Sequence, residues 1–522
     1  MIMLGAILAF IPFVVTLTAI LKYKMKTHKA GLLGTVITWI IAIVYSKTSI
    51  SLLFAAWIYG ILVPMSYTLA GFAAWYMTYH MIFHGCFDDI QEGIKRMKGG
   101  LVFKTFFLCF GMGVMMLSSG AGFTWLAVVL NDMGISPWAV SILIEGSADP
   151  LTQYAYYATP VVVPTLLYGE QFGFTLADLM PMFNRFFWVT IPGFALAMLW
   201  VLKEDGHKVS RRDAAIVFVY GLILAGVVNI LNLTVDIMAV GILAGAIGMA
   251  ILYGAQRLGL FSASKDLSEQ YEPMTGEQDS RFKRAIAPLV IVSVLAGLWG
   301  SFGKPIENAL GVIRIPIIAD QSVPFKVMQP AVWPLVTILI MFTFLKISKE
   351  SHSYTMNLIK DRWIITQVAN WMFAGMVFSY FWSGKVIVDG ALILPPENAH
   401  LNLMNSLATF ATSWGLHPYI VMVPFMSMFA TTLLGSELTS TTFFTPFHFA
   451  ASKALGWAKP TVFMVGHVVA NIGITDIRKL MKNVALIGAY GEEYKALRKT
   501  FVIGLIITAA TIIPLLSFLL WP

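Results

Sequence analysis

Residues 180–230 read MPMFNRFFWVTIPGFALAMLWVL, then KEDGHKVSRR, then DAAIVFVYGLILAGVVNI. The first and third segments are apolar runs of about 20 residues, the length that an α-helix needs to cross the hydrocarbon core of a bilayer. The segment between them is short and rich in Lys and Arg. The pattern predicts two membrane-spanning helices joined by a basic loop.

The composition of the whole chain agrees with this pattern. Of its 522 residues, 58% are hydrophobic and only 12% are charged, whereas a soluble domain carries about 25% charged residues. The two cysteines, Cys86 and Cys109, exclude a disulfide framework. The formal charge of +8 would suit nucleic acid, but the basic residues lie in short loops between apolar stretches. We therefore expect a lipid bilayer as the partner and no nucleic acid.

We expect an all-α polytopic membrane protein with about 12–14 transmembrane helices. Met1 to Leu21 is uncharged and lacks both the basic start and the cleavage site of a signal peptide, so we expect it to be retained as the first helix. The clear candidate spans are residues 2–21, 30–46, 50–77, 103–118, 180–202, 213–230, 236–254, 285–302, 331–346, 363–382 and 499–521.

Six basic loops predict the orientation of the chain. The spans between them allow all six to lie on one side of the membrane, and the excess of Lys and Arg assigns that side to the cytoplasm. We therefore expect a multi-pass protein of the plasma (inner) membrane with both termini outside. The loops lie near residues 22–29, 88–104, 203–212, 257–284, 346–362 and 478–499.

The loop at residues 257–284 differs from the others because it is long and also carries several acids. Its central position predicts a cytoplasmic linker between two membrane halves, residues 1–256 and 285–522.

Two apolar stretches, residues 119–179 and 401–477, are interrupted by Gly, Pro, Ser and Thr. Each has a break of small or hydroxyl residues, a short apolar run and a turn with Gly and Pro. Interrupted helices leave backbone N–H and C=O groups that lipid cannot satisfy, so they persist where they line a cavity. Paired interruptions in two halves point to the binding site of a transporter.

Glu437 is the acid of the second interruption. A carboxylate deep in a membrane is costly, so it can hold a proton, while nearby hydroxyls and backbone amides can bind an anion. In the structural alternative, the hydroxyls cap a helix N-terminus and Glu437 lies at its polar boundary. The candidate substrate ligands around it are Gly435, Ser436, Thr439, Ser440 and Thr441.

Glu145 and Asp149 are proton-coupling candidates in the first interruption. The prolines that follow, among them Pro160 and Pro164, predict that residues 146–164 form no regular helix. Two interpretations stay open: the acids belong to a second half-site, or they lie on a wet structural loop outside the membrane.

Four polar residues in apolar segments are further candidates. His448 can relay protons because histidine titrates near neutrality, and so can His467, which Asn471 follows one turn later as a candidate substrate ligand. Each histidine can equally be a hydrogen-bonded packing residue. Arg185 can pair with a substrate carboxylate, or it can extend its charged end to the outer interface.

Motifs for catalysis and for cofactors are absent. His80 and His84 have the i, i+4 spacing of a metal-binding pair, but the His-Glu-x-x-His pattern does not occur, so we expect no metal site. A Walker loop, a dinucleotide fingerprint and a nucleophile elbow are missing too. We therefore predict neither an enzyme nor a cofactor.

Two short stretches carry a family resemblance. They read Leu117-Ser118-Ser119-Gly120-Ala121-Gly122-Phe123-Thr124-Trp125-Leu126 and Gly435-Ser436-Glu437-Leu438-Thr439-Ser440-Thr441. These stretches resemble the motifs Leu-Glu-Gly-Ala-Ala-Gly-Phe-Gly-Ala-Pro and Gly-Ser-Asp-Thr-Ser-Ser-Asn of the lactate permease family. The layout agrees as well, from the opening Ile11-Pro12-Phe13 to the closing Trp521-Pro522.

The resemblance implies import of L-lactate, D-lactate and glycolate with protons by two inverted halves with re-entrant hairpins. It adds Ser119, Gly120, Ala121 and Gly122 as substrate-binding candidates.

The chain also departs from the family pattern. The family's motif Glu is Ser118 here, and the Lys of its Gly-Lys-Met-Ile-Ser-Pro-Gln stretch aligns with Gly473. Another cation, Arg478 or Arg185, would then have to pair with the substrate anion.

These observations predict a secondary active transporter. It would import a small organic anion, lactate or a related 2-hydroxy monocarboxylate, by proton symport with alternating access. The alternative is a membrane-embedded channel or complex subunit without coupled transport. An intramembrane enzyme is disfavoured because no cluster has the spacing of a metal or nucleophile site.

Overall fold

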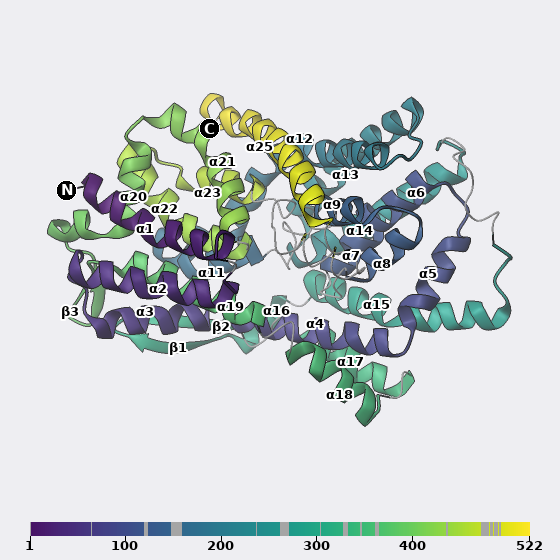
Figure 1. Cartoon of the computed structure of the whole chain (residues 1–522), viewed down its shortest axis with the longest axis horizontal. Coiled ribbons are helices and arrows are strands. Elements are labelled where there is room, and N and C mark those ends of the chain that lie inside the picture. Colours follow the sequence, from purple (N-terminus) through teal and green to yellow (C-terminus); the bar gives the residue numbers. More distant parts are fainter. Residues whose placement is uncertain are drawn as a thin grey trace.

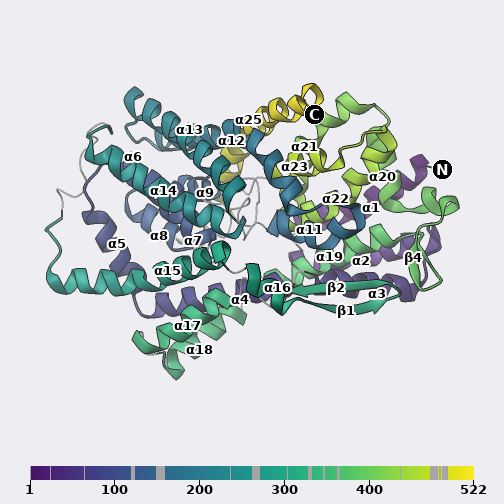
Figure 2. The same ribbon diagram turned by 180° about the vertical axis from the view of Figure 1, so that it is seen from behind.

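The chain folds into an array of packed helices with two small β-hairpins (Figures 1 and 2). The computed structural model describes residues 2–23, 25–63, 65–118, 124–147, 159–235, 237–261, 271–302, 304–326, 332–344, 347–360, 365–434, 437–470, 480, 484, 489 and 492–521.

The first half of the chain contains the helices α1 (Ile2–Leu21), α2 (Thr27–Val44), α3 (Ile50–Leu62), α4 (Met65–Phe83), α5 (Cys86–Arg96), α6 (Leu101–Phe106), the π-helix η1 (Phe107–Met112), α7 (Gly113–Ser118), α8 (Thr124–Asp132), α9 (Pro137–Glu145), α11 (Thr159–Phe172), α12 (Leu176–Glu204), α13 (Arg211–Thr234) and α14 (Ile237–Arg257). The second half contains α15 (Gly276–Phe302), α16 (Lys304–Leu310), β1 (Val312–Ile318), β2 (Gln321–Lys326), α17 (Val332–Phe344), α18 (Lys349–Leu358), α19 (Ile365–Trp382), β3 (Val386–Val388), β4 (Ala391–Ile393), the 3-10 helix η4 (Pro396–Leu401), α20 (Leu403–Thr412), α21 (Leu416–Leu434), α22 (Glu437–Leu455), α23 (Pro460–Ala470) and α25 (Glu493–Leu520).

Each predicted span is helical over nearly all of its described residues. Residues 180–202 lie in α12 and residues 213–230 in α13, whereas the predicted span 50–77 is shared by α3 and α4, between which the sequence has Pro64. Among the described residues, α12, α13, α14, α15 and α25 are long and apolar enough to cross a membrane, and shorter apolar helices accompany them. The all-α prediction is confirmed, and these helices indicate a membrane-embedded protein.

Local sequence signals set the loop between α12 and α13. Gly206 has a φ of +87°, a left-handed conformation that favours glycine, and it turns the chain after α12. Ser210 caps α13, because its Oγ accepts the N–H of Asp213 at 3.0 Å and Asp213 Oδ2 accepts the N–H of Ser210 at 3.0 Å. Asp205 Oδ2 accepts the N–H of Ser136 at 2.8 Å, so this basic loop also holds the start of α9.

Helices from distant parts of the sequence are interleaved. α19 packs against α2 and α3, and α1 packs against α20, whereas α15 packs against α5, α7 and α14 (Figure 1). Polar contacts accompany this packing: Trp39 Nε1 donates to Ser379 Oγ at 2.9 Å, and the Tyr380 hydroxyl donates to Ala9 O at 2.6 Å. Helices of both predicted halves therefore share one core.

Glycine allows α3 and α19 to cross closely. A Cβ atom added at Gly60 would lie 2.7 Å from the backbone C and O atoms of Ala374 and from the N atom of Gly375. Two helix backbones approach this closely only where a residue has no side chain, which is a common device in membrane helices. Gly60 therefore sets the distance between the two helices.

Two β-hairpins add to the all-α prediction. β1 and β2 form an antiparallel hairpin that packs along α3 (Figure 2). β3 and β4 are joined by Asp389 and Gly390, whose φ angles of +51° and +79° suit a two-residue turn between twisted strands. Asp320 Oδ1 accepts the N–H of Leu392 at 2.8 Å, so the two hairpins touch.

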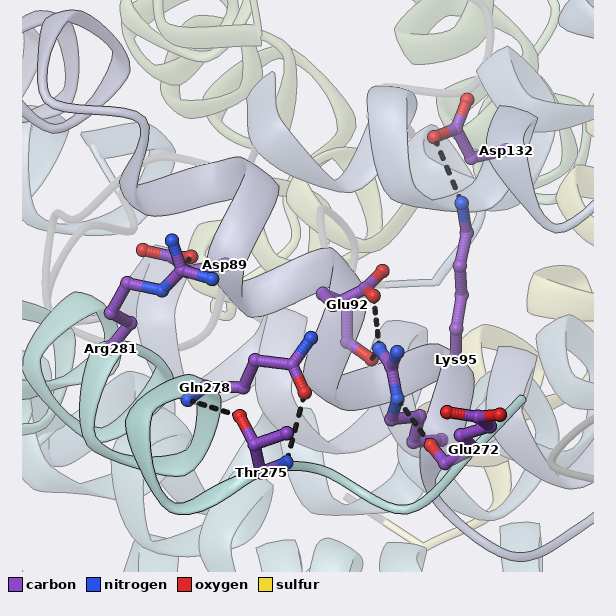
Figure 3. A network of polar contacts seen from close by, with 9 residues as sticks. Asp89, Glu92, Lys95, Asp132, Glu272, Thr275, Gln278 and Arg281 are labelled. Atoms are coloured by element: carbon purple, nitrogen blue, oxygen red, sulfur yellow. Dashed lines mark hydrogen bonds and ion pairs between the residues drawn. The ribbon is translucent and has the colours of Figure 1, made fainter.

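A polar network ties the end of the predicted linker, residues 257–284, to α5 (Figure 3). Arg281 Nε lies 3.7 Å from Asp89 Oδ1, and Arg96 Nε donates to Glu272 O at 2.7 Å. Because α15 begins inside this segment, the last part of the linker is helical and docked. The remaining contacts in the figure are the ion pairs Lys95–Asp132 and Arg96–Glu92 and the hydrogen bonds between Thr275 and Gln278.

Helix α11 corrects the expectation that residues 146–164 contain no regular helix. Pro160 is the second residue of α11, where backbone N–H groups have no partner within the helix, so proline is tolerated there. Pro164 lies further in and leaves one helix hydrogen bond unmade, while the Thr165 hydroxyl beside it donates to Val161 O at 2.8 Å. The prolines begin this helix rather than prevent it.

Candidate functional site

The two interruptions lie only partly within the described residues. The structure describes the helices that flank them, α7 and α8 at the first and α21 and α22 at the second. Thr439 lies in α22, but its side chain is outside the described part. The roles of the following predicted residues stay predictions because they lie outside the described residues: Ser119, Gly120, Ala121, Gly122, Asp149, Gly435, Ser436, Asn471 and Arg478.

The helices on both sides of the second interruption belong to a three-helix unit, α21, α22 and α23. α22 begins at Glu437 and reverses into α23 at Gly456, whose φ of +66° favours glycine. The Ser452 hydroxyl donates to Trp457 O at 2.5 Å and Trp457 N donates to Ser452 O at 2.9 Å, which closes the turn. α21 packs against both α22 and α23, so side chains of three helices converge.

Glu437 is the first residue of α22 and is only 8% exposed. The first turn of a helix has free N–H groups and the positive end of the dipole, so a carboxylate is electrostatically favoured there. The Thr441 hydroxyl donates to Glu437 O at 2.6 Å, and the Thr445 hydroxyl donates to Thr441 O at 2.8 Å. These bonds to the helix backbone favour a structural role for the Thr441 hydroxyl.

Ser440 connects α22 to α23. Its Oγ lies 2.9 Å from Nε2 of His467, and both side chains are buried. The Ser427 hydroxyl of α21 donates to His467 O at 2.5 Å. That carbonyl is among the last four of α23, which have no donor within the helix, so Ser427 satisfies it.

His448 lies two turns after Ser440 on the same face of α22. Its Nδ1 is 2.7 Å from the Tyr419 hydroxyl of α21, and its ring centroid is 5.1 Å from that of His467. The Phe444 ring stacks on His467 with centroids 4.6 Å apart. Both histidines are almost fully excluded from solvent, with exposures of 0% and 1%.

Each histidine has one ring nitrogen without a hydrogen-bond partner among the described residues. These atoms are Nε2 of His448 and Nδ1 of His467, and both are buried. A buried polar atom without a partner costs roughly 1–3 kcal/mol, so natural proteins rarely keep one without a reason. The pair is therefore a candidate for binding something that comes and goes, such as a proton.

A hydrogen bond at a proline position joins α11 to α22. Pro446 has no N–H, so it leaves the carbonyl of Thr442 without its helix partner. The Tyr168 hydroxyl of α11 donates to this Thr442 O at 3.1 Å, and both residues are buried. Helix α11, which lies in the interrupted stretch 119–179, thus contacts helix α22, which lies in the interrupted stretch 401–477.

Glu145, in the interrupted stretch 119–179, lies inside the protein. It ends α9 and is 0% exposed, which does not fit the alternative of a wet exterior loop. α9 packs against α12 and α25, and α23 packs against the same two helices. The Ser141 hydroxyl of α9 donates to Leu480 O at 3.2 Å, which links the two predicted halves directly. Glu145 and His467 therefore lie on helices that share two neighbours.

Arg185 joins α12 to the end of α25. Its Nη1 donates to Trp521 O at 2.7 Å and to Ser517 Oγ at 3.3 Å, and the guanidinium carbon lies 4.1 Å from the centroid of the Phe518 ring. These contacts favour a structural role, and we leave Arg185 out of the proposed site.

His80 and His84, the spacing of which suggested a metal pair, lie on or beside α4. The Thr355 hydroxyl of α18 lies 3.1 Å from His80 Nδ1. Within the described ranges, no group of three or more His, Cys, Asp or Glu side chains is placed to hold a metal ion.

Sequence reasoning missed two features, one in the site and one next to the first interruption along the chain. One is the Tyr419 hydroxyl, for which the sequence offers no local signal because it comes from another helix. The other is the π-helix η1, which directly precedes α7 and the first interruption; π-turns are frequent at functional sites. The recurrence of Ser440, Phe444 and His448 at every fourth residue was the available signal for one polar face of α22.

Comparison with known proteins does not identify the chain. No protein-family model matches it, and no curated protein matches it either. The resemblance to the lactate permease family therefore rests on the quoted residues.

Proposed function

We propose that this chain is a secondary active transporter that imports a small organic anion, lactate or a related 2-hydroxy monocarboxylate, together with a proton. The observation that carries the proposal is a buried polar cluster in an apolar helical protein. Its described members are Glu437, Ser440, His448 and His467. Ionisable groups inside membrane proteins are costly, and they usually serve substrate binding or proton transfer.

The start of α22 offers a place for the carboxylate of the substrate. A helix N-terminus attracts anions through its free N–H groups and its dipole. Interrupted helices in transporters often direct such N-termini at anionic substrates. We assign the substrate carboxylate to this N-terminus, with the Ser440 hydroxyl and the backbone at Gly435 and Ser436 as ligands.

The same cluster contains groups that can carry the proton. Glu437 stands three residues before Ser440, so the two lie on one face of α22. Binding of one proton, on Glu437 or His448, together with one monoanion leaves the charge of the site unchanged, so loading adds no net charge. Moving an uncompensated charge costs about 2.3 kcal/mol per 100 mV of membrane potential, so neutral loading lowers the barrier to crossing.

Alternating access would require two parts that move around one site. The arrangement in which α9 and α23 both pack on α12 and α25 supports a model with two inverted halves, because corresponding hairpin helices then meet common neighbours. In this model the site faces the outside with its proton and anion bound, then faces the cytoplasm and releases both.

Uptake into proteoliposomes tests the proposal. The full chain is reconstituted, and entry of labelled L-lactate is measured with and without an inward proton gradient. We expect accumulation that depends on the gradient. Gradient-insensitive uptake would reject proton coupling, and absence of uptake for every 2-hydroxy acid tried would reject the substrate class.

A matched pair of variants locates the site. Ser440→Ala should reduce lactate uptake about tenfold, which corresponds to the loss of one hydrogen bond. Thr234→Ala is the control, since its hydroxyl donates to Ile230 O at 2.8 Å at the exposed end of α13. Equal uptake by the two variants would remove Ser440 from the site.

A further inference from the structure

The two buried histidines are joined to hydroxyl groups on both sides. The Tyr419 hydroxyl contacts His448 Nδ1 and the Ser440 hydroxyl contacts His467 Nε2, and the centroids of the two rings are 5.1 Å apart. We call the remaining ring nitrogens, His448 Nε2 and His467 Nδ1, the inner nitrogens. The two inner nitrogens have no partner among the described residues, and the two outer ones are bonded. Each ring is therefore held by a hydroxyl through one nitrogen, while its other nitrogen has no partner among the described residues.

Hydroxyl partners suit rings that change their protonation state. A hydroxyl can donate to a neutral ring nitrogen or accept from a protonated one, so the outer hydrogen bonds survive in either state. A carbonyl or an amide N–H in the same place would fix one tautomer. The choice of Tyr419 and Ser440 as partners therefore leaves the inner nitrogens free to gain and lose a proton.

The other titratable groups around the two histidines are engaged elsewhere, so proton binding is assigned to the histidine pair. Of the elements packed against α22 and α23, α20 has no titratable side chain, and the tyrosines of α11 and α19 bond to the backbone at Thr442 O and Ala9 O. Glu204 of α12 pairs with Lys499 of α25 at 2.6 Å. Glu170 of α11 is exposed and pairs with Arg314 at 2.8 Å. Glu437, at the start of α22, is the described carboxylate nearest in sequence to Ser440.

Two charges cannot coexist easily at this separation. With ring centroids 5.1 Å apart, repulsion between two imidazolium ions at an effective dielectric of about 20 disfavours double protonation by roughly two orders of magnitude. The pair therefore titrates as one unit that binds a first proton much more easily than a second.

We infer that His448 and His467 form a single proton-binding unit that fixes the stoichiometry of transport at one proton for each anion. This inference rests on the proposed function. On loading, an O–H bond of hydronium or of protonated Glu437 breaks and an N–H bond forms on an inner nitrogen; release reverses the step. Because the bound anion stabilises the imidazolium, each ligand strengthens binding of the other by the same factor.

The test uses the full chain in proteoliposomes, with labelled L-lactate to count anions and an entrapped pH dye to count protons. The wild type should move one proton for each lactate. His448→Gln and His467→Gln should reduce gradient-driven accumulation far more than lactate exchange, which needs no net proton movement. The double variant should be no worse than either single one. The control is His417→Gln, an exposed residue of α21, which should behave as the wild type.

A second measurement does not depend on transport. Nitrogen-15 NMR of the histidines in nanodiscs, assigned with the single variants, follows the pair across pH. The first proton should bind about two pH units above the second, as the repulsion requires. Rings that become charged together, or Gln variants that still accumulate lactate, would overturn the inference. A wild type that moves no anion would reject the proposed function, while the NMR titration would still decide the histidine pair.

Discussion

The close crossing of α3 and α19 can be tested by adding a single methyl group. Gly60→Ala places a Cβ atom 2.7 Å from three backbone atoms of α19, in Ala374 and Gly375. Backbone atoms cannot rotate away as a side chain can, so α3 and α19 must separate. Overpacking of this kind costs about 1–3 kcal/mol.

A matched substitution isolates this cost. Gly193 lies inside α12, and a Cβ atom there would meet nothing within 4 Å. Both changes gain the same helix propensity, about 1 kcal/mol for glycine to alanine. That term cancels in the comparison, so Gly60→Ala should be less stable than Gly193→Ala by about 1–3 kcal/mol.

Thermal unfolding of the detergent-purified variants, followed by loss of the monodisperse size-exclusion peak, measures this difference. At about 2 °C per kcal/mol for a large chain, Gly60→Ala should melt ~2–6 °C below Gly193→Ala. Equal midpoints would mean that the two helices have room for a methyl group, and the close crossing would be refuted.

Three further predictions concern function, orientation and pH. Glu437→Gln should fold and exchange lactate but lose proton coupling, and wild-type accumulation in that variant would exclude Glu437 from the mechanism. If the basic loops are cytoplasmic, an impermeant maleimide added to intact cells should label Glu397→Cys and spare Lys208→Cys, both at exposed positions; the reverse pattern would invert the topology. Burial alone raises the pKa of Asp205, but the neighbouring His207 and the hydrogen bonds from Ser136 outweigh it and hold the pKa below its ordinary value of 3.8. Its contribution to stability is therefore present above pH 3.8 and lost as the pH falls through the lower folded value, so Asp205→Asn should flatten the acid limb of a stability–pH curve.

The helical framework could be predicted from sequence because its signals are local. An apolar run of sufficient length between polar loops identifies a helix such as α13 without knowledge of its neighbours. Capping is local too, as the Ser210 and Asp213 pair shows. The β3–β4 hairpin also had a local signal, Asp389-Gly390 between apolar residues, which our prediction overlooked.

The candidate site was only partly predictable because it depends on contacts between helices. His448 and His467 stood out singly as polar residues in apolar segments, but their pairing follows from the turn at Gly456 and the packing of α22 on α23. The Tyr419 hydroxyl comes from a third helix, and no neighbouring sequence pattern predicts its contact with His448. Likewise, the proline pattern of α11 misled because its effect depends on where the helix begins.

The interleaving of distant helices has a consequence for how the protein is made. α3 leaves the ribosome about 300 residues before α19, the helix that closes against it. At ~5–20 residues per second, synthesis of that stretch takes roughly 15–60 s. During this interval the face of α3 that carries Gly60 contacts lipid or a membrane chaperone instead of its final neighbour. Biogenesis of this chain therefore favours a membrane insertase that shelters early helices until the late ones arrive, and separately expressed fragments should assemble only when both are inserted together.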